Sequence, residues 1–273
     1  MPLDFLAFRG QICLVMTNQG DQTYESSDDT STGSGMPFLD HLEELRWRLV
    51  KSVLAVVVMA GASFYFRDQL FDFLVRPLGD IELHFTEVTG SFYAYLKVSL
   101  ITGVVLAVPI VFYQFWAFVS PGLYHREKAA ALPLVMTSTV LFVIGAGFCY
   151  YVVLPLALDF LIGFSEGLLN PIVTVNSYIS FAGLLLVAFG VGFELPVVAY
   201  LLGRMGLITA PFLARGRRYA IIIILIAGAI ITPPDVFTQV LLAGPVYLLY
   251  EVSIIVVRIT GRKRDEAGGV LEE

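Results

Sequence analysis

Charged residues are scarce in this chain, at 15% of 273 residues, whereas soluble domains carry about 25%. Cysteine is scarce too, and the only two, Cys13 and Cys149, do not form a disulfide framework. The three histidines, His41, His84 and His125, are too scattered in sequence to indicate a metal site. The H-E-x-x-H, G-x-S-x-G and P-loop patterns are absent, and these are the usual signatures of metal-dependent, nucleophilic and nucleotide-driven chemistry. We therefore expect no catalytic residues, no metal and no cofactor.

Long apolar runs are what the sequence has in quantity, with 57% apolar residues and a mean hydropathy of +0.80. A helix needs about 20 largely apolar residues to cross about 30 Å of hydrocarbon, and in lipid it must satisfy its own backbone hydrogen bonds. Six segments are candidate spans: residues 49–66, 96–119, 129–156, 179–202, 219–231 and 236–257. The predicted fold class is an all-α integral membrane protein with six transmembrane helices.

The last two predicted spans are short. Residues 219–231 reach only about 20 Å, and the sixth span is free of charge only over 236–250, about 22 Å, before Glu251. Short spans are accommodated by local thinning of the bilayer or by packing against partners. Between the first two spans we expect a short amphipathic helix and an extended stretch at 81–85, with a second loop, 163–177, on the same side.

The distribution of Lys and Arg among the loops predicts the orientation, because cytoplasmic loops are enriched in these residues. One side carries three of them, Arg67, Arg76 and Lys97. The other side carries thirteen: Arg46, Arg48, Lys51, Arg126, Lys128, Arg204, Arg215, Arg217, Arg218, Arg258, Arg262, Lys263 and Arg264. We therefore place both termini and the loop 118–130 in the cytoplasm.

The chain divides into three parts by composition. Residues 1–35 are rich in Ser, Thr, Gly and Asp and have too little apolar surface to offset the entropy of ordering. They are either a disordered tail or an over-called N-terminus, with Met36 as the working initiator. Residues 36–264 form the predicted membrane domain, and 265–273 form a flexible C-terminal tail.

Two acidic residues on the predicted cytoplasmic face, Glu44 and Glu127, are candidate binding residues. Each has a structural alternative: Glu44 can pair with Arg48 four residues on, for about 0.2–0.5 kcal/mol, and Glu127 can begin the third helix, where an acid suits the helix dipole. Two carboxylates among basic loops can instead select a ligand with two adjacent guanidinium groups. Each guanidinium bonds a carboxylate through two N–H groups, a geometry that lysine cannot reproduce.

Aromatic residues lie just before the 118–130 loop, in which Pro121 and the following glycine break the helix. One interpretation is an aromatic belt at the membrane interface, as is common in membrane proteins. The residues of this predicted belt are Phe112, Tyr113, Phe115, Trp116 and Phe118.

Glu194 is a carboxyl within a predicted span, which costs about 2.5–3.5 kcal/mol on insertion scales, so its default interpretation is functional. Gly190, Gly192 and Pro196 around it are expected to loosen the helix and admit water or a neighbouring backbone. The alternative is a protonated structural acid that is hydrogen-bonded to another helix.

The segment between the two short spans begins with Thr232, Pro233, Pro234 and Asp235, which is typical of a helix N-cap with proline in the first turn. Gln239 lies one turn further on. An amide in a thin region of the membrane can hydrogen-bond a partner helix, for about 0.6–2 kcal/mol.

These motifs together resemble the TatC family, the multi-spanning component of the twin-arginine protein translocase. The resemblance covers about residues 36–263 and rests on four correctly spaced motifs: HLEELRWR at 41–48, PIVFYQFWAFVSPGLYHREK at 109–128, AFGVGFELPV at 188–197 and TPPDVFTQ at 232–239. It implies a concave helix bundle in the cytoplasmic (inner) membrane. Its implied function is a receptor for folded precursor proteins whose signal peptides carry two consecutive arginines.

The resemblance also implies roles for individual residues. Glu44 and Glu127 would face the arginine pair, and Arg46, Phe118 and Tyr124 would shape the recognition surface.

Further roles implied by the resemblance lie within the membrane, where Glu194 corresponds to an intramembrane acid of the family. Thr232 and Gln239 fall where single-span TatA-type partner helices dock, and whether a TatB-type partner exists is left open. The implied partners are these helices, the precursors, further copies of the chain and the lipid bilayer, without nucleic acid. The implied energy source is the proton-motive force.

Two other classes of function compete with a receptor. A secondary transporter would use Glu194 as a proton or ion site, but it would need a polar cavity lined by several spans, and the sequence offers almost no other membrane acid. An intramembrane enzyme would need a nucleophile and a base, and no such pair is evident. A receptor should copurify with single-span partners and precursors, whereas a transporter need not.

Overall fold

The computed structural model describes residues 36–79, 81, 83–119, 131–163, 172–231 and 236–269. The chain divides between Glu43 and Glu44 into two units. Of the first unit, only the start of helix α1 (Met36–Tyr65), up to Glu43, is described.

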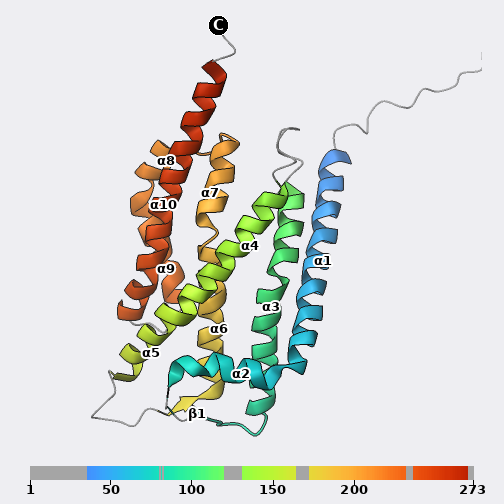
Figure 1. The fold of residues 1–273 in the computed structure, drawn as a ribbon, viewed down its shortest axis with the longest axis vertical. Coiled ribbons are helices and arrows are strands. Elements are labelled where there is room, and N and C mark those ends of the chain that lie inside the picture. Colours follow the sequence, from blue (N-terminus) through green and yellow to red (C-terminus); the bar gives the residue numbers. More distant parts are fainter. Residues whose placement is uncertain are drawn as a thin grey trace, which may run out of the picture. The chain divides into compact units, whose positions relative to one another are not determined.

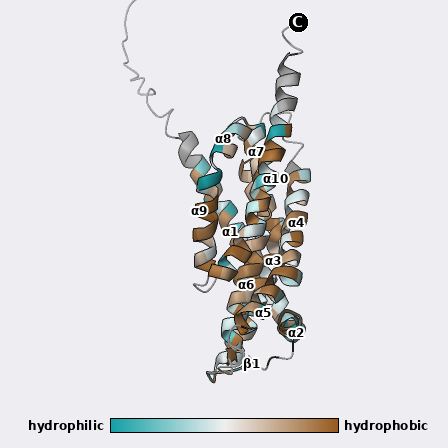
Figure 2. Ribbon diagram, turned by 90° about the vertical axis from the view of Figure 1, so that its left-hand side faces the viewer, coloured by the Kyte–Doolittle hydropathy of each residue, from teal (hydrophilic) through white to brown (hydrophobic). Residues whose placement is uncertain are grey.

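Five helical segments are long and apolar enough to cross a membrane: His41–Tyr65, Gly90–Val119, Leu132–Gly163, Val175–Arg204 and Val236–Gly261. They correspond to α1, to α3 (Gly90–Val119), to α4 (Ala131–Phe148) with α5 (Leu154–Gly163), to α6 (Val175–Gly192) with α7 (Leu195–Arg204), and to the start of α10 (Val236–Gly269) (Figure 1). Apolar residues run along these helices in Figure 2. The prediction of an all-α integral membrane protein is confirmed.

The sixth predicted span forms α9 (Arg217–Ile231), a helix of 15 residues. Its length is about 22 Å, less than the hydrocarbon thickness, so whether it spans the membrane stays a prediction. The helix α10 continues for 34 residues, to Gly269, beyond the predicted end at residue 257. Only its charge-free part, 236–250, is short. Glu251, which follows that part, pairs with Arg217 at the start of α9, at 2.8 Å.

The third predicted span contains one wide π turn, Cys149–Val153, between α4 and α5. Pro155 comes directly after this turn and has no N–H to continue the α-helical bonds. In membrane helices such a loss is absorbed by local π or 3₁₀ turns. The helix therefore continues to Gly163, beyond the predicted end at residue 156.

A short helix, α2 (Arg67–Val75), lies between the first two spans as predicted, and a 3₁₀ turn (Arg76–Leu78) continues it. Two tyrosines from later spans bond to carbonyls near its end: the Tyr150 hydroxyl donates to Phe73 O at 2.6 Å, and the Tyr178 hydroxyl to Leu74 O at 2.7 Å. These bonds satisfy acceptors that a helix end leaves without an intrahelical partner.

Beyond α2 the chain forms a two-residue strand, β1 (Leu83–His84), within the stretch predicted to be extended. It pairs in parallel with β2 (Val173–Thr174), with Leu83 opposite Val173 and His84 opposite Thr174. The pairing shows that the two predicted loops lie on the same side of the molecule.

The main hydrophobic core is built chiefly from α3, the π turn, α5 and α6, and Phe189, Leu154 and Ile179 are among its fully buried side chains. α4 and α6 approach closely at Gly145, where an added Cβ would lie 2.7 Å from Phe189 O. Small residues permit such close backbone packing in membranes.

Candidate functional site

Glu44 lies on α1 and contacts the side chain of Arg48, one turn further along. Its Oε1 accepts a hydrogen bond from Arg48 Nε at 2.9 Å and another from Nη2 of the same guanidinium. The structural alternative for this residue is therefore present in the fold. The same geometry shows that the Glu44 carboxylate receives a guanidinium group through two nitrogens.

The other residues of the predicted recognition surface are described only in part. Arg46 is exposed on α1, and Phe118 is half-buried one residue before the end of α3. The remaining predicted site residues lie outside the part of the chain that the structure describes: Pro121, Tyr124, Glu127, Thr232, Pro233, Pro234 and Asp235.

Glu194 lies at a break between α6 and α7, where the sequence predicted a loosened helix. Phe193 and Glu194 form a turn, and Pro196 is in the first turn of α7, where its missing N–H does no harm. Glu194 occupies the N-cap position of α7, but its side chain makes no capping bond to that helix. It is instead directed into the protein, where the residue is only 6% exposed.

Ser138, in the middle of α4, lies beside Glu194, close enough for the two side chains to interact. The Ser138 oxygen in turn accepts a hydrogen bond from the indole Nε1–H of Trp116 on α3, at 3.1 Å. A serine has a single O–H, so accepting from Trp116 leaves that hydrogen for the carboxyl. The Glu194 atom Oε1 is buried without a hydrogen-bond partner among the described residues.

The burial of Trp116 corrects the prediction of an interfacial aromatic belt. Trp116 is only 4% exposed and packs with Val135, Val197 and Leu201, so it does not belong to an interfacial belt. Tyr113 is 56% exposed and remains consistent with a belt. Neither Trp116 nor Ser138 was predicted as a site residue, although a buried indole usually requires a hydrogen-bond acceptor.

Gln239 lies in the first turns of α10 and is half-buried. Its side-chain amide donates to Leu225 O in α9 at 2.8 Å, and an added Cβ at Gly228 of α9 would lie 3.4 Å from Gln239 Cγ. The amide therefore joins α9 to α10 within the chain itself. A partner helix at this position would meet an amide that already has one internal bond.

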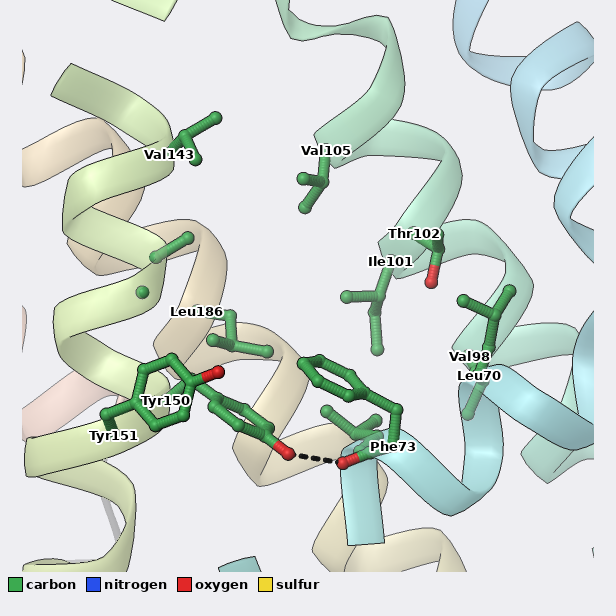
Figure 3. A pocket seen from close by; sticks show the side chains of 13 residues that line it. Leu70, Phe73, Val98, Ile101, Thr102, Val105, Val143, Tyr150, Tyr151 and Leu186 are labelled. Carbon is green, nitrogen blue, oxygen red and sulfur yellow. Dashed lines mark hydrogen bonds between the residues drawn. The ribbon is translucent and has the colours of Figure 1, made fainter. Parts of the chain in front are cut away.

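An apolar pocket of about 320 Å³ lies between α2, α3, the α4–π segment and α6 (Figure 3). Phe73, Ile101, Val143 and Leu186 are among the side chains that line it. The hydroxyl of Tyr150 at its edge is already bonded to Phe73 O, as the dashed line shows. The described residues that line the pocket include no charged side chain, which suits it to apolar groups.

Comparison with known proteins shows a close relationship to one family. Residues 40–245 match the family described as Sec-independent protein translocase protein (TatC). The curated TatC of Desulforapulum autotrophicum is 46% identical over 234 residues, which are 84% of this chain and 87% of the relative. That of Aquifex aeolicus is 45% identical over 237 residues, 85% of this chain and 98% of the relative.

A solved structure agrees with this relationship. The crystal structure of a twin-arginine translocase receptor, TatC, superposes with a TM-score of 0.75 at 45% identity. It covers 81% of this chain and 99% of the solved one. Sequence and fold therefore match over most of the chain, and the protein is a multi-pass membrane protein and a component of a protein translocase. The chain belongs to the TatC family of Sec-independent protein translocase proteins.

Proposed function

We propose that this chain is the receptor and core subunit of a twin-arginine translocase in the cytoplasmic membrane. It binds the signal peptides of folded precursors at a cytoplasmic surface made of Glu44, Arg46, Phe118, Tyr124 and Glu127. Both termini lie in the cytoplasm in this proposal. The observation that carries it is the contact of the Glu44 carboxylate with two nitrogens of one guanidinium, a group that an arginine pair would supply twice.

Transport in this proposal requires partners, because six helices cannot enclose a folded protein. TatA-type single-span helices, and TatB-type helices where the cell has them, dock beside Thr232 and Gln239. Copies of the chain associate within the receptor complex. The proton-motive force supplies the energy. Support comes from the short helix α9 and from the Gln239 amide, which lies between α9 and α10.

A secondary transporter built on Glu194 is less well supported. Ser99 and Ser253, two other buried polar residues among those described, bond to the backbone of their own helices, at Tyr95 O and Leu249 O. They therefore do not add to a polar path through the spans. Glu194 also lies beside Ser138 of a neighbouring helix, which favours the structural alternative considered for it.

The test is site-specific photocrosslinking of a twin-arginine precursor to membranes that contain the full-length protein. A probe placed beside the arginine pair should crosslink near Glu44 and within the 118–130 loop. The crosslinks should be lost in Glu44→Ala and in Glu127→Ala. They should also be lost with a precursor that carries paired lysines, because a lysine ammonium cannot bond a carboxylate through two fixed N–H groups as a guanidinium does.

Glu43→Ala is the matched control, since it removes a neighbouring exposed acid and should leave the crosslinks in place. Crosslinks that persist with paired lysines would exclude carboxylate recognition of the arginine pair.

A further inference from the structure

We propose that Ser138 and Trp116 are positioning residues for Glu194. Together the three residues form one hydrogen-bonded unit that joins the end of α3 to the break between α6 and α7, and this unit serves transport and not signal binding. The inference rests on the proposed function, because it assigns Glu194 a part in transport.

The orientation of Ser138 sets it apart from its neighbours. Three hydroxyl residues follow one another in α4: Thr137, Ser138 and Thr139. Thr137 donates to Pro133 O and Thr139 to Val135 O, so both hydroxyls are used within their own helix. The Ser138 hydroxyl, which is 0% exposed, is used between helices.

Burial makes this arrangement costly to disturb. Trp116, Ser138 and Glu194 are all buried among spans that cross the membrane, where water does not replace a lost partner. Without the serine hydroxyl, both the indole N–H and one carboxyl oxygen would lose a partner. In the proposed unit Ser138 bonds one carboxyl oxygen of Glu194, and Oε1, which has no partner among the described residues, is left for a proton or for a donor from another molecule.

The positions of the three residues connect two regions of the proposed function. Trp116 is two residues before Phe118 and three before the end of α3, next to the loop assigned to signal recognition. Its ring packs against Val197 and Leu201 of α7. α7 in turn packs on α10 at Gly203, where an added Cβ would lie 3.1 Å from a Val257 methyl. A shift at the end of α3 thus reaches Glu194 and α7 through direct contacts.

The first test measures the chain itself. The protein has two tryptophans, Trp47 and Trp116, so Trp47→Phe leaves Trp116 as the single indole reporter. Ultraviolet resonance Raman spectra of the full-length protein in nanodiscs then report the hydrogen bonding of the indole N–H.

Ser138→Ala should move the indole band to the position of an unbonded N–H. Glu194→Leu should shift the indole band part of the way, because it removes the acceptor of Ser138, and that acceptor strengthens the bond from Trp116 to Ser138. Glu194→Gln, which keeps an acceptor, should restore the parental band. Thr139→Val, which removes the adjacent hydroxyl at equal size, should leave the band unchanged. An unchanged band in Ser138→Ala or in Glu194→Leu would overturn the proposed chain.

The second test asks whether Ser138 acts through Glu194. We expect Ser138→Ala to slow the transport of a twin-arginine precursor into inverted membrane vesicles by about fivefold or more, the effect of leaving one buried group unsatisfied. In the Glu194→Leu background the same substitution should change the rate by less than about twofold. Thr139→Val should transport at the parental rate.

The affinity for a twin-arginine peptide separates this role from a structural one. It should stay within about twofold of the parent in Ser138→Ala and in Glu194→Leu, because the proposed unit does not touch the peptide. Additive effects on transport, a parental transport rate in Glu194→Leu, or a parallel loss of peptide affinity would overturn the inference. A parental protein that binds no twin-arginine peptide would instead overturn the proposed function and leave the Raman result intact.

Discussion

At the scale of single residues, two of the acids singled out in the sequence already lie beside polar groups of the same chain. Glu44 bonds to Arg48, and Glu194 lies beside the hydroxyl of Ser138. For Glu44 this means that an incoming arginine would replace an internal guanidinium and would not meet a bare carboxylate. A helical pair of this spacing contributes only about 0.2–0.5 kcal/mol, so the exchange costs little.

Replacing Arg48 by Gln tests this exchange. Without the competing guanidinium, we expect a twin-arginine peptide to bind up to about twofold more tightly, which corresponds to the small free energy of the internal pair. Fluorescence anisotropy of a labelled peptide with the protein in nanodiscs measures the change. A tenfold loss of affinity would instead show that Arg48 belongs to the binding surface.

Prediction of single residues succeeded where a residue conflicts with its surroundings. A carboxyl in an apolar span is such a conflict, so Glu194 was identified from the sequence. Ser138 was not, because the sequence does not show which of three consecutive hydroxyls turns away from its own helix. Trp116 was misassigned because aromatic residues near a helix end are compatible with a lipid interface and with a core. Only the packing of α3 against α4 and α7 distinguishes the two.

At the scale of elements, glycines determine how closely the helices approach one another. The approach of α4 to α6 at Gly145 leaves no room for a side chain, since an added Cβ would also lie 2.7 Å from Phe193 Cγ. Gly147, two residues along the same helix, has nothing within 4 Å of an added Cβ. The two positions make a matched pair.

Gly145→Ala should destabilise the protein by about 1–3 kcal/mol, because the new methyl group overlaps a backbone oxygen and an aromatic ring that cannot both move away. Gly147→Ala should leave the stability unchanged or raise it by up to about 1 kcal/mol, through the better helix propensity of alanine. Unfolding by SDS titration in mixed micelles measures both. Equal stabilities of the two variants would contradict the close approach of α4 to α6.

The boundaries of elements were predictable where a local chemical cause exists. Gly190, Gly192 and Pro196 indicated the break that the structure has at Phe193 and Glu194. The end of the charge-free part of α10 before Glu251 was predictable, but the pairing of Glu251 with Arg217, on another helix, was not.

At the scale of the whole molecule, the apolar runs predict the membrane-embedded class and the motifs predict the family. Orientation rests on the unequal distribution of Lys and Arg alone. Val88, just before α3, and Leu207, between α7 and α8 (Ala210–Arg215), are both exposed. The start of α3 and the connection from α7 to α8 lie at opposite ends of the long spans (Figure 1).

These two positions test the orientation directly. In a protein with Cys13→Ser and Cys149→Ser, we expect Val88→Cys to react with a membrane-impermeant maleimide in intact spheroplasts. Leu207→Cys should react only after lysis, because the basic loops are placed in the cytoplasm. Mass-tag gel shifts give the labelled fraction at each site. The reverse pattern would invert the proposed orientation and place Glu44 on the wrong side for precursors.

The bonds that hold α2 also bear on the order in which the protein is made. Tyr150 and Tyr178, which bond its final carbonyls, follow their partners by 77 and 104 residues. At about 5–20 residues per second, α2 leaves the ribosome roughly 5–20 s before Tyr178 does. During biosynthesis, α1, α2 and α3 therefore exist for some time before these bonds can form, and a chain truncated before α6 would lack the bond from Tyr178 to Leu74 O.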